Sequence, residues 1–139
     1  MKVAIITSKF NHEITEQLHK TAVVRLKERN IADKDMVSVW VPGAVEIPLI
    51  AQHMAKQKKY DAIICMGAVI RGETSHYDYV CQSVTDGCQR VALDHHIPVI
   101  FGILTTEDET QAEARIEKAR DWVDAAFEMV KLVKQVENA

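Results

Sequence analysis

The chain has 139 residues, of which 47% are hydrophobic and 27% charged, a composition typical of a globular protein with one domain, residues 1–139. Its formal net charge is −3 and no block of Lys or Arg stands out, which argues against a nucleic acid or an anionic membrane as partner. No apolar run approaches the about 20 residues of a membrane-spanning helix, and the start of the chain is a poor signal peptide, so we expect a cytoplasmic protein.

The first half of the chain reads as two strand–helix units. Val3–Thr7 is a short β-branched run, and apolar residues then recur at helical spacing over Ile14–Arg29. Met36–Val41 is a second strand, which Pro42-Gly43 ends. A helix follows up to Lys56, with Pro48 in its first turn, where the missing N–H of proline costs nothing.

The second half repeats this order. Tyr60–Met66 is predicted as a third strand and Ser75–His95 as a long helix. Ile97–Leu104 is the fourth strand, and the apolar spacing from Ala112 to Val133 predicts helices to near the end of the chain.

Strict alternation of strands and helices predicts an α/β fold. The short connections favour a three-layer αβα sandwich around a four-stranded parallel sheet, with flavodoxin-like winding and right-handed crossovers. A sheet this small, with Phe10, Trp40 and Phe101 near strand ends, leaves apolar surface that one chain does not cover. We therefore expect an oligomer.

The three cysteines show no metal or redox spacing. Cys65 lies in a strand-like run, whereas Cys81 and Cys88 share one face of a predicted helix. An odd number of cysteines without a signal peptide favours reduced thiols that pack in the interior. The histidines also lack ligand spacing, so we expect no metal site.

The stretch Gly67–Val80 combines an anion-binding pattern with a titratable side chain. It follows an apolar run and contains Ser75 and Asp78 in the spacing of a helix start. Gly72-Glu73-Thr74 offers backbone donors at that helix start, where anions bind well. Histidine changes charge near neutral pH, so His76 is placed to move protons. The alternative is an ordinary strand–helix loop with a capping serine and a surface histidine.

Other chemically interesting residues also follow strands, which brings them to one edge of a parallel sheet. Phe10 can stack on a flat heterocycle or simply plug the loop. Glu46 can accept hydrogen bonds from a polyol, or it is a carboxylate that favours a helix N-terminus. Arg115 can pair with a phosphate, or it is a solvated surface residue.

Four segments together resemble the 6,7-dimethyl-8-ribityllumazine synthase family. They are Phe10-Asn11, Gly43-Ala44-Val45-Glu46-Ile47-Pro48, the whole Gly67–Val80 stretch, and Pro98-Val99-Ile100-Phe101-Gly102. They occur in the family's order over nearly the whole chain, each near a different strand. Any one of them is modest support, but the ordered set is specific.

The resemblance implies a reaction. This family condenses 5-amino-6-(D-ribitylamino)uracil with 3,4-dihydroxy-2-butanone 4-phosphate to 6,7-dimethyl-8-ribityllumazine, releasing phosphate and water in the penultimate step of riboflavin biosynthesis. It uses neither a metal nor an organic cofactor. One substrate supplies its own amine nucleophile, so the protein must align two molecules, which lowers the barrier by up to roughly 7–11 kcal/mol.

The resemblance also implies roles for individual residues. Phe10 would stack on the uracil ring, which Ala68-Val69-Ile70 would border. Ala44-Val45-Glu46 would hold the ribityl chain through backbone groups and the Glu46 carboxylate.

At the other substrate, Glu73 and Thr74 would hold the phosphate, with Arg115 opposite. His76 would transfer the protons that Schiff-base formation and phosphate loss require. Phe101 would come from a neighbouring subunit, because in this family the pocket lies at the interface of a pentamer.

Two departures from the family pattern bear on phosphate binding and assembly. Many members have a Gly- and Lys-rich segment where this chain reads Glu117-Lys118-Ala119-Arg120-Asp121-Trp122-Val123, so we assign no lysine to the phosphate. Many members also carry an extra segment before the first strand. We therefore expect a pentamer and leave a sixty-subunit shell open.

Two other functions fit the pattern less well. A flavodoxin-type binding module would hold a flavin or phosphate without chemistry, but no long ligand-binding loops follow the first or third strand. A shell-forming relative without activity would have no need of Phe10, Glu46, His76 and Arg115 together.

Overall fold

Four parallel strands form one sheet in the computed structural model, which describes all residues from 1 to 139. The elements in chain order are β1 (Val3–Ser8), α1 (His12–Glu28), the 3-10 turn η1 (Asp33–Asp35), β2 (Met36–Val41), the 3-10 turn η2 (Ala44–Glu46), α2 (Ile47–Lys56), β3 (Ala62–Ile70), α3 (His76–His95), β4 (Val99–Thr106), α4 (Glu109–Glu113) and α5 (Lys118–Glu137).

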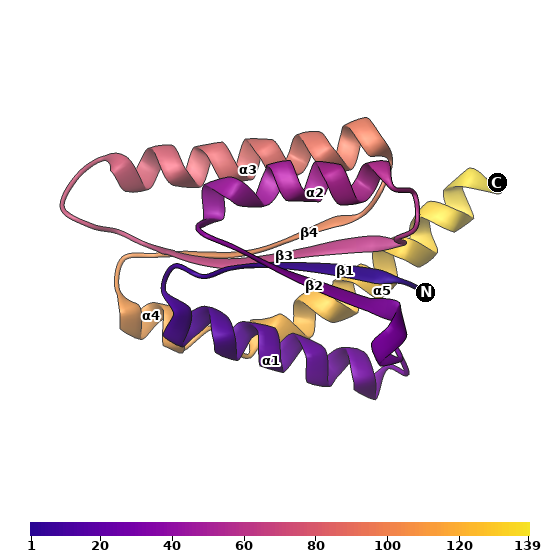
Figure 1. Cartoon of the computed structure of the whole chain (residues 1–139), viewed down its shortest axis with the longest axis horizontal. Helices are drawn as coiled ribbons and strands as arrows, with labels where there is room; N and C mark the ends of the chain where they lie inside the picture. Colours follow the sequence, from indigo (N-terminus) through magenta and orange to yellow (C-terminus); the bar gives the residue numbers. More distant parts are fainter.

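The strand order is β2-β1-β3-β4, and every neighbouring pair is parallel. Helices α2 and α3 cover one face of the sheet, while α1, α4 and α5 cover the other (Figure 1). The predicted three-layer α/β sandwich with flavodoxin-like winding is confirmed. In this winding the chain leaves β1 toward β2 and later returns on the other side at β3, which opens a crevice at the carboxyl ends of β1 and β3.

The central strands are buried on both faces. Every residue of β1 is buried, and so is all of β3 except Ile70 at its end. Continuous apolar runs of this kind are typical of parallel strands covered by helices on both sides. One hydrophobic cluster joins the sheet to α1 and α5, and a second joins it to α2 and α3.

Strand β3 is longer than the sequence predicts. The predicted end at Met66 is wrong, because residues 67–70 continue the pairing with β4 from Gly67 opposite Ile103 to Ile70 opposite Thr106. Glycine at position 67 leaves room for close packing, because a Cβ there would lie 2.7 Å from the Ser8 Oγ atom. Strand β4 is likewise shifted toward the end of the chain and closes at Thr106.

The cysteines pack between the sheet and α3. Cys65 and Cys88 are buried, as predicted, whereas Cys81 is half-buried. The Cys88 thiol and complete burial raise the pKa of Cys65 well above its ordinary value, so this thiol is protonated at neutral pH. None of the helices has the length and apolar character needed to cross a membrane.

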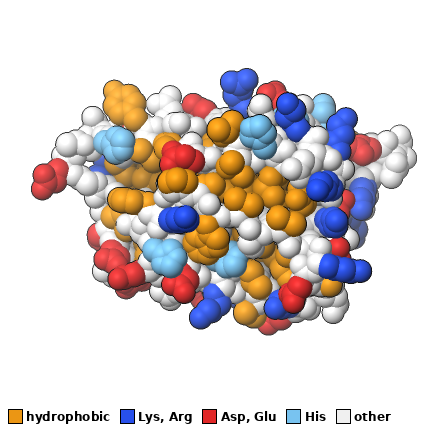
Figure 2. All heavy atoms as spheres, in the orientation of Figure 1, with side chains coloured by type: hydrophobic (Ala, Val, Ile, Leu, Met, Phe, Trp, Pro, Cys, Tyr) orange, Lys and Arg blue, Asp and Glu red, His pale blue; other side chains and the backbone are white.

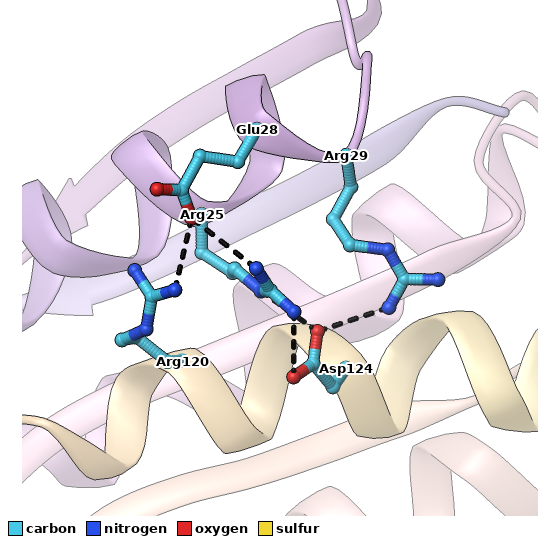
Figure 3. A network of polar contacts seen from close by, with 5 residues as sticks. All are labelled: Arg25, Glu28, Arg29, Arg120 and Asp124. Atoms are coloured by element: carbon cyan, nitrogen blue, oxygen red, sulfur yellow. Dashed lines mark hydrogen bonds and ion pairs between the residues drawn. The ribbon is translucent and has the colours of Figure 1, made fainter.

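Five charged residues connect α1 to α5 (Figure 3). The Asp124 carboxylate accepts hydrogen bonds of 2.9 Å from Arg25 Nε and from Arg29 Nη1. Glu28 pairs with Arg25 at 3.3 Å and with Arg120 at 3.0 Å. Hydrogen bonds from Arg25 and then from Arg29 lower the pKa of Asp124, because both favour its charged form.

We predict that Asp124→Asn destabilises the fold by roughly 0.5–1 kcal/mol at neutral pH, a small value because the pairs are partly exposed to solvent. The pKa of Asp124 is lowered in the folded state, so its stabilisation is complete above the unfolded pKa and is lost as pH falls through the folded one. Urea unfolding of both proteins at several pH values measures the difference, which should shrink in acid.

Glu128→Gln is the matched control, because Glu128 lies in the middle of the same helix, is exposed and forms no ion pair. It should leave stability unchanged. An equal loss in both variants, or an Asp124→Asn effect that grows in acid, would contradict the assigned role of the network.

Candidate functional site

A pocket of about 330 Å³ opens at the carboxyl ends of β1 and β3, on the side of α2 and α3. Eight of its twelve lining residues are hydrophobic, so it suits a flat, largely apolar ligand with a few polar groups. The lining residues are Phe10, Gly43, Ala44, Val45, Ala68, Val69, Ile70, Gly72, Thr74, His76, Tyr77 and Val80.

The segment after β1 supplies the aromatic wall. Phe10 is 71% exposed, which excludes the alternative that its side chain packs inside the loop. Asn11 holds the turn: its backbone lies in the left-handed region with φ 61°, which asparagine tolerates, and its Nδ2 donates to the Ala68 carbonyl at 2.8 Å. This bond ties the loop that carries Phe10 to the pocket edge of β3.

The segment after β2 lines the pocket through Ala44 and Val45. The Glu46 carboxylate does not line the pocket, and its Oε1 accepts a hydrogen bond of 3.0 Å from the Gly43 amide. It therefore stabilises the 3-10 turn, as expected of a carboxylate at a helix N-terminus. The second carboxylate oxygen has no partner within the chain and keeps its acceptor capacity.

The end of β3 and the loop after it supply the floor and the mouth. Ala68, Val69 and Ile70 line the pocket from the strand, and the following residues up to His76 are exposed. The backbone amides of residues 72–75 donate no hydrogen bond within the chain. Four consecutive free donors ahead of a long helix form a site suited to an anion.

The helix start differs from the prediction. Ser75 was expected to cap α3, but it has helical torsion angles and its side chain accepts no capping bond. Instead the Thr74 hydroxyl accepts a hydrogen bond of 3.3 Å from the His76 amide. His76 is the first residue of α3, and its exposed side chain lies at the pocket mouth.

Tyr77 is a lining residue that the sequence analysis missed. Burial, and then the neighbouring Cys81, raise the pKa of its hydroxyl, which is a neutral hydrogen-bond donor at physiological pH. The guanidinium carbon of Arg71 lies 4.3 Å from the centre of its ring. The sequence spacing could have indicated this residue. Val80 lies three positions after Tyr77 and four after His76, and residues three and four apart share a helix face.

Three further predicted site residues lie outside this pocket. Glu73 is exposed on the loop, and Arg115 lies between α4 and α5, where its Nη1 donates to the Gln111 carbonyl at 2.8 Å. Phe101 is in β4 opposite Cys65 and is 38% exposed. No group of three or more His, Cys, Asp or Glu side chains is arranged to hold a metal ion.

Together, the fold and the pocket define a class: α/β proteins that bind a small molecule at the switch point of a parallel sheet, with an imidazole at the mouth. A model of the 6,7-dimethyl-8-ribityllumazine synthase family matches residues 1–134. Proteins of that name from three strains of Coxiella burnetii, Dugway 5J108-111, CbuG_Q212 and RSA 493, are each 52% identical over 141 aligned positions. The alignments cover 98% of this chain and 93% of each relative.

This chain belongs to the 6,7-dimethyl-8-ribityllumazine synthase family. The family predicted from four ordered segments is confirmed, and with it the expectation of an enzyme. The individual roles of the site residues stay predictions.

The close contact below the pocket gives a prediction about packing. Gly67→Ala places a methyl group 2.7 Å from Ser8 Oγ, and such overpacking should cost about 1–3 kcal/mol. Ser8 Oγ is buried without a hydrogen-bond partner, so Ser8→Ala should cost little by itself. The double variant should recover most of the loss, because the remaining Ser8 Cβ lies at 3.6 Å.

Urea unfolding of the four proteins measures this coupling as a double-mutant cycle. Additive effects of the two changes would show that the Ser8 hydroxyl is not the obstacle.

Proposed function

We propose that this chain condenses 5-amino-6-(D-ribitylamino)uracil with 3,4-dihydroxy-2-butanone 4-phosphate to 6,7-dimethyl-8-ribityllumazine, releasing phosphate and water in riboflavin biosynthesis. Beside family membership, the pocket supports this function. It unites the segments after β1, β2 and β3 that the resemblance implicated separately.

The pyrimidine fits the apolar part of the pocket. The exposed Phe10 ring offers an aromatic face for stacking, and Ala68-Val69-Ile70 borders the same space. The Asn11 bond to the Ala68 carbonyl fixes these two walls relative to each other. A slot formed in advance binds a rigid ring without a cost for ordering the walls.

The ribityl chain suits the turn after β2. Ala44 and Val45 present backbone groups at the pocket edge, and the free oxygen of the Glu46 carboxylate can accept a bond from a hydroxyl group. Because the Gly43 amide already holds Glu46, this acceptor is positioned before the substrate binds.

The phosphate suits the loop after β3. The free amides of residues 72–75, the Thr74 hydroxyl and the N-terminus of α3 all favour an anion. Arg115 forms no ion pair and is bonded only to a backbone carbonyl, so its charge is available to a phosphate group. We propose that Glu73 takes part through its backbone amide.

Little chemical activation is required of the protein. The substrate amine is the nucleophile, so the pocket has to align two molecules, and His76 at the mouth lies where protons must move. Imine formation releases water from the carbonyl, and a proton donor assists both this step and the departure of phosphate.

Mixing both substrates with the purified protein tests the activity, since the lumazine product is detected by its absorbance. His76→Gln should lower turnover on the order of a hundredfold, because a positioned acid–base group contributes at least that much. The thermal midpoint and the affinity for the pyrimidine substrate should stay unchanged, since His76 forms no side-chain bond that supports the fold.

His95→Gln is the matched control at the opposite end of α3. It should leave turnover intact. Absence of product from the unaltered protein would refute the proposed activity, whereas full turnover in His76→Gln would refute only the role of His76.

We propose further that the working unit is a pentamer in which Phe101 completes the pocket of a neighbouring subunit. Phe101 is exposed and lies apart from the pocket of its own chain. Hydrophobic side chains gather across the middle of one face of the molecule (Figure 2). Exposed apolar surface of this kind is typical of subunit interfaces.

A mixing experiment tests the shared site. Phe10→Ala and Phe101→Ala should each lower turnover, but rings assembled from both variants should regain activity, because about a quarter of the sites then combine the two intact sides. As control, Phe10→Ala mixed with His76→Gln should regain none, since both residues belong to the pocket of one chain. A monomer in solution, or no recovery in the first mixture, would contradict the shared site.

The single domain over residues 1–139 and the cytoplasmic location stay predictions from the sequence.

A further inference from the structure

The loop between β3 and α3 has little support of its own. Its residues from Gly72 to Ser75 are exposed and their amides bond to nothing within the chain. No atom beyond the two adjacent residues lies within 4 Å of a Cβ placed on Gly72. A segment with so few contacts is mobile unless its ends are held. The proposed phosphate site and His76 both depend on this loop.

Arg71 holds both ends of the loop. At its start, the Arg71 backbone amide donates to the Thr106 carbonyl at 2.9 Å. At its end, the guanidinium group lies over the Tyr77 ring, with its carbon 4.3 Å from the ring centre, and Nη2 lies 3.4 Å from the Asp78 carboxylate. These two contacts hold the first turn of α3 in place, directly after His76.

The same guanidinium group reaches the segment after β4. Arg71 Nε donates to Glu107 Oε2 at 2.7 Å, a short charge-assisted bond between residues 36 positions apart in the sequence. The loop after β3 and the turn before α4 are thereby joined. We call the contacts of Arg71 with Tyr77, Asp78 and Glu107 the Arg71 clasp.

From Glu107 the connection continues to Arg115. The Glu107 amide donates to Gln111 Oε1 at 2.8 Å, and the Gln111 carbonyl accepts from Arg115 Nη1 at the same distance. The free amides after β3 and the unpaired charge of Arg115 are therefore linked through one chain of bonds that passes through Arg71.

Arg71 is poorly suited to be a phosphate ligand itself. One carboxylate is bonded to its Nε, a second lies beside its Nη2, and an aromatic ring covers one side of its plane. Its partners are 60% exposed, so the ion pairs add little to global stability. The specific effect of the clasp is geometric.

We propose that Arg71 is a positioning residue for the phosphate-bearing substrate: the clasp fixes His76 and the free amides after β3 relative to Arg115. This inference rests on the proposed function. A small displacement of such groups is costly in turnover even when the fold is intact.

Arg71→Met tests the clasp, because methionine keeps much of the length and apolar stem but loses every donor. We expect kcat to fall on the order of tenfold and KM for the phosphate-bearing substrate to rise by a similar factor. The affinity for the pyrimidine substrate and the thermal midpoint should stay unchanged. Arg71→Lys should recover only part of the loss, since an ammonium group cannot serve two carboxylates and stack on the ring as a guanidinium does.

Glu107→Gln and Arg90→Met are the companion variants. Glu107→Gln breaks the ion pair but keeps the shape, and its effect should not add to that of Arg71→Met if both act through the clasp. Arg90 lies on α3 as well, but its side chain is 81% exposed and pairs weakly with Asp94 at 3.9 Å, so Arg90→Met should leave both constants unchanged.

Binding of inorganic phosphate, measured by calorimetry, gives a readout that needs no turnover, and Arg71→Met should weaken it. Two outcomes would refute the clasp when the unaltered protein is active. In the first, Arg71→Met changes neither KM for the phosphate-bearing substrate nor phosphate binding. In the second, Arg71→Met lowers the affinity for the pyrimidine substrate and the stability as much as it affects phosphate binding. Inactivity of the unaltered protein refutes the proposed function, while weaker phosphate binding in Arg71→Met would still support the clasp. If Arg71→Met does not fold, additivity of Glu107→Gln with Arg71→Lys would refute it.

Discussion

Parallel pairing between β1 and β3 is the constraint on which the rest of the structure depends. The two strands are buried on both faces, so the helices must divide between the two sides of the sheet, and the chain must leave β1 in one direction and return in the other. That reversal opens the crevice where the pocket lies. The order of the strands therefore determines where the pocket lies, and the loop residues determine which chemical groups line it.

Within the crevice, each wall is fixed by a hydrogen bond between side chain and backbone. Asn11 bonds to β3, Glu46 holds the turn after β2, and Thr74 accepts from the first amide of α3. Short polar side chains bond readily to nearby backbone, which makes loops definite in shape without a hydrophobic core beneath them. The pocket is therefore largely formed before a ligand arrives, and its apolar surface is free to receive a ring.

The sequence predicted the order of the elements, the parallel sheet and most of the pocket, because alternation of apolar runs and the ends of strands are local signals. It failed where the outcome depended on partners distant in the chain. The extension of β3 to Ile70 follows from pairing with β4, and the contact of Arg71 with Glu107 spans 36 positions. The prediction named Ser75 as the capping residue, whereas Thr74 accepts the hydrogen bond. Spacing alone does not give the backbone torsion angles that decide which side chain faces the helix end.

The free amides after β3 also bear on how the reaction cycle ends. In the proposed phosphate site, backbone dipoles and one exposed arginine would bind the anion without burying a compensating charge. Because Arg71 is already paired with two carboxylates, it adds little net positive charge to the loop. Inorganic phosphate, once detached from the carbon skeleton, loses the contacts that the rest of the substrate made. Such a site would favour release of the phosphate, so that this step need not limit the cycle.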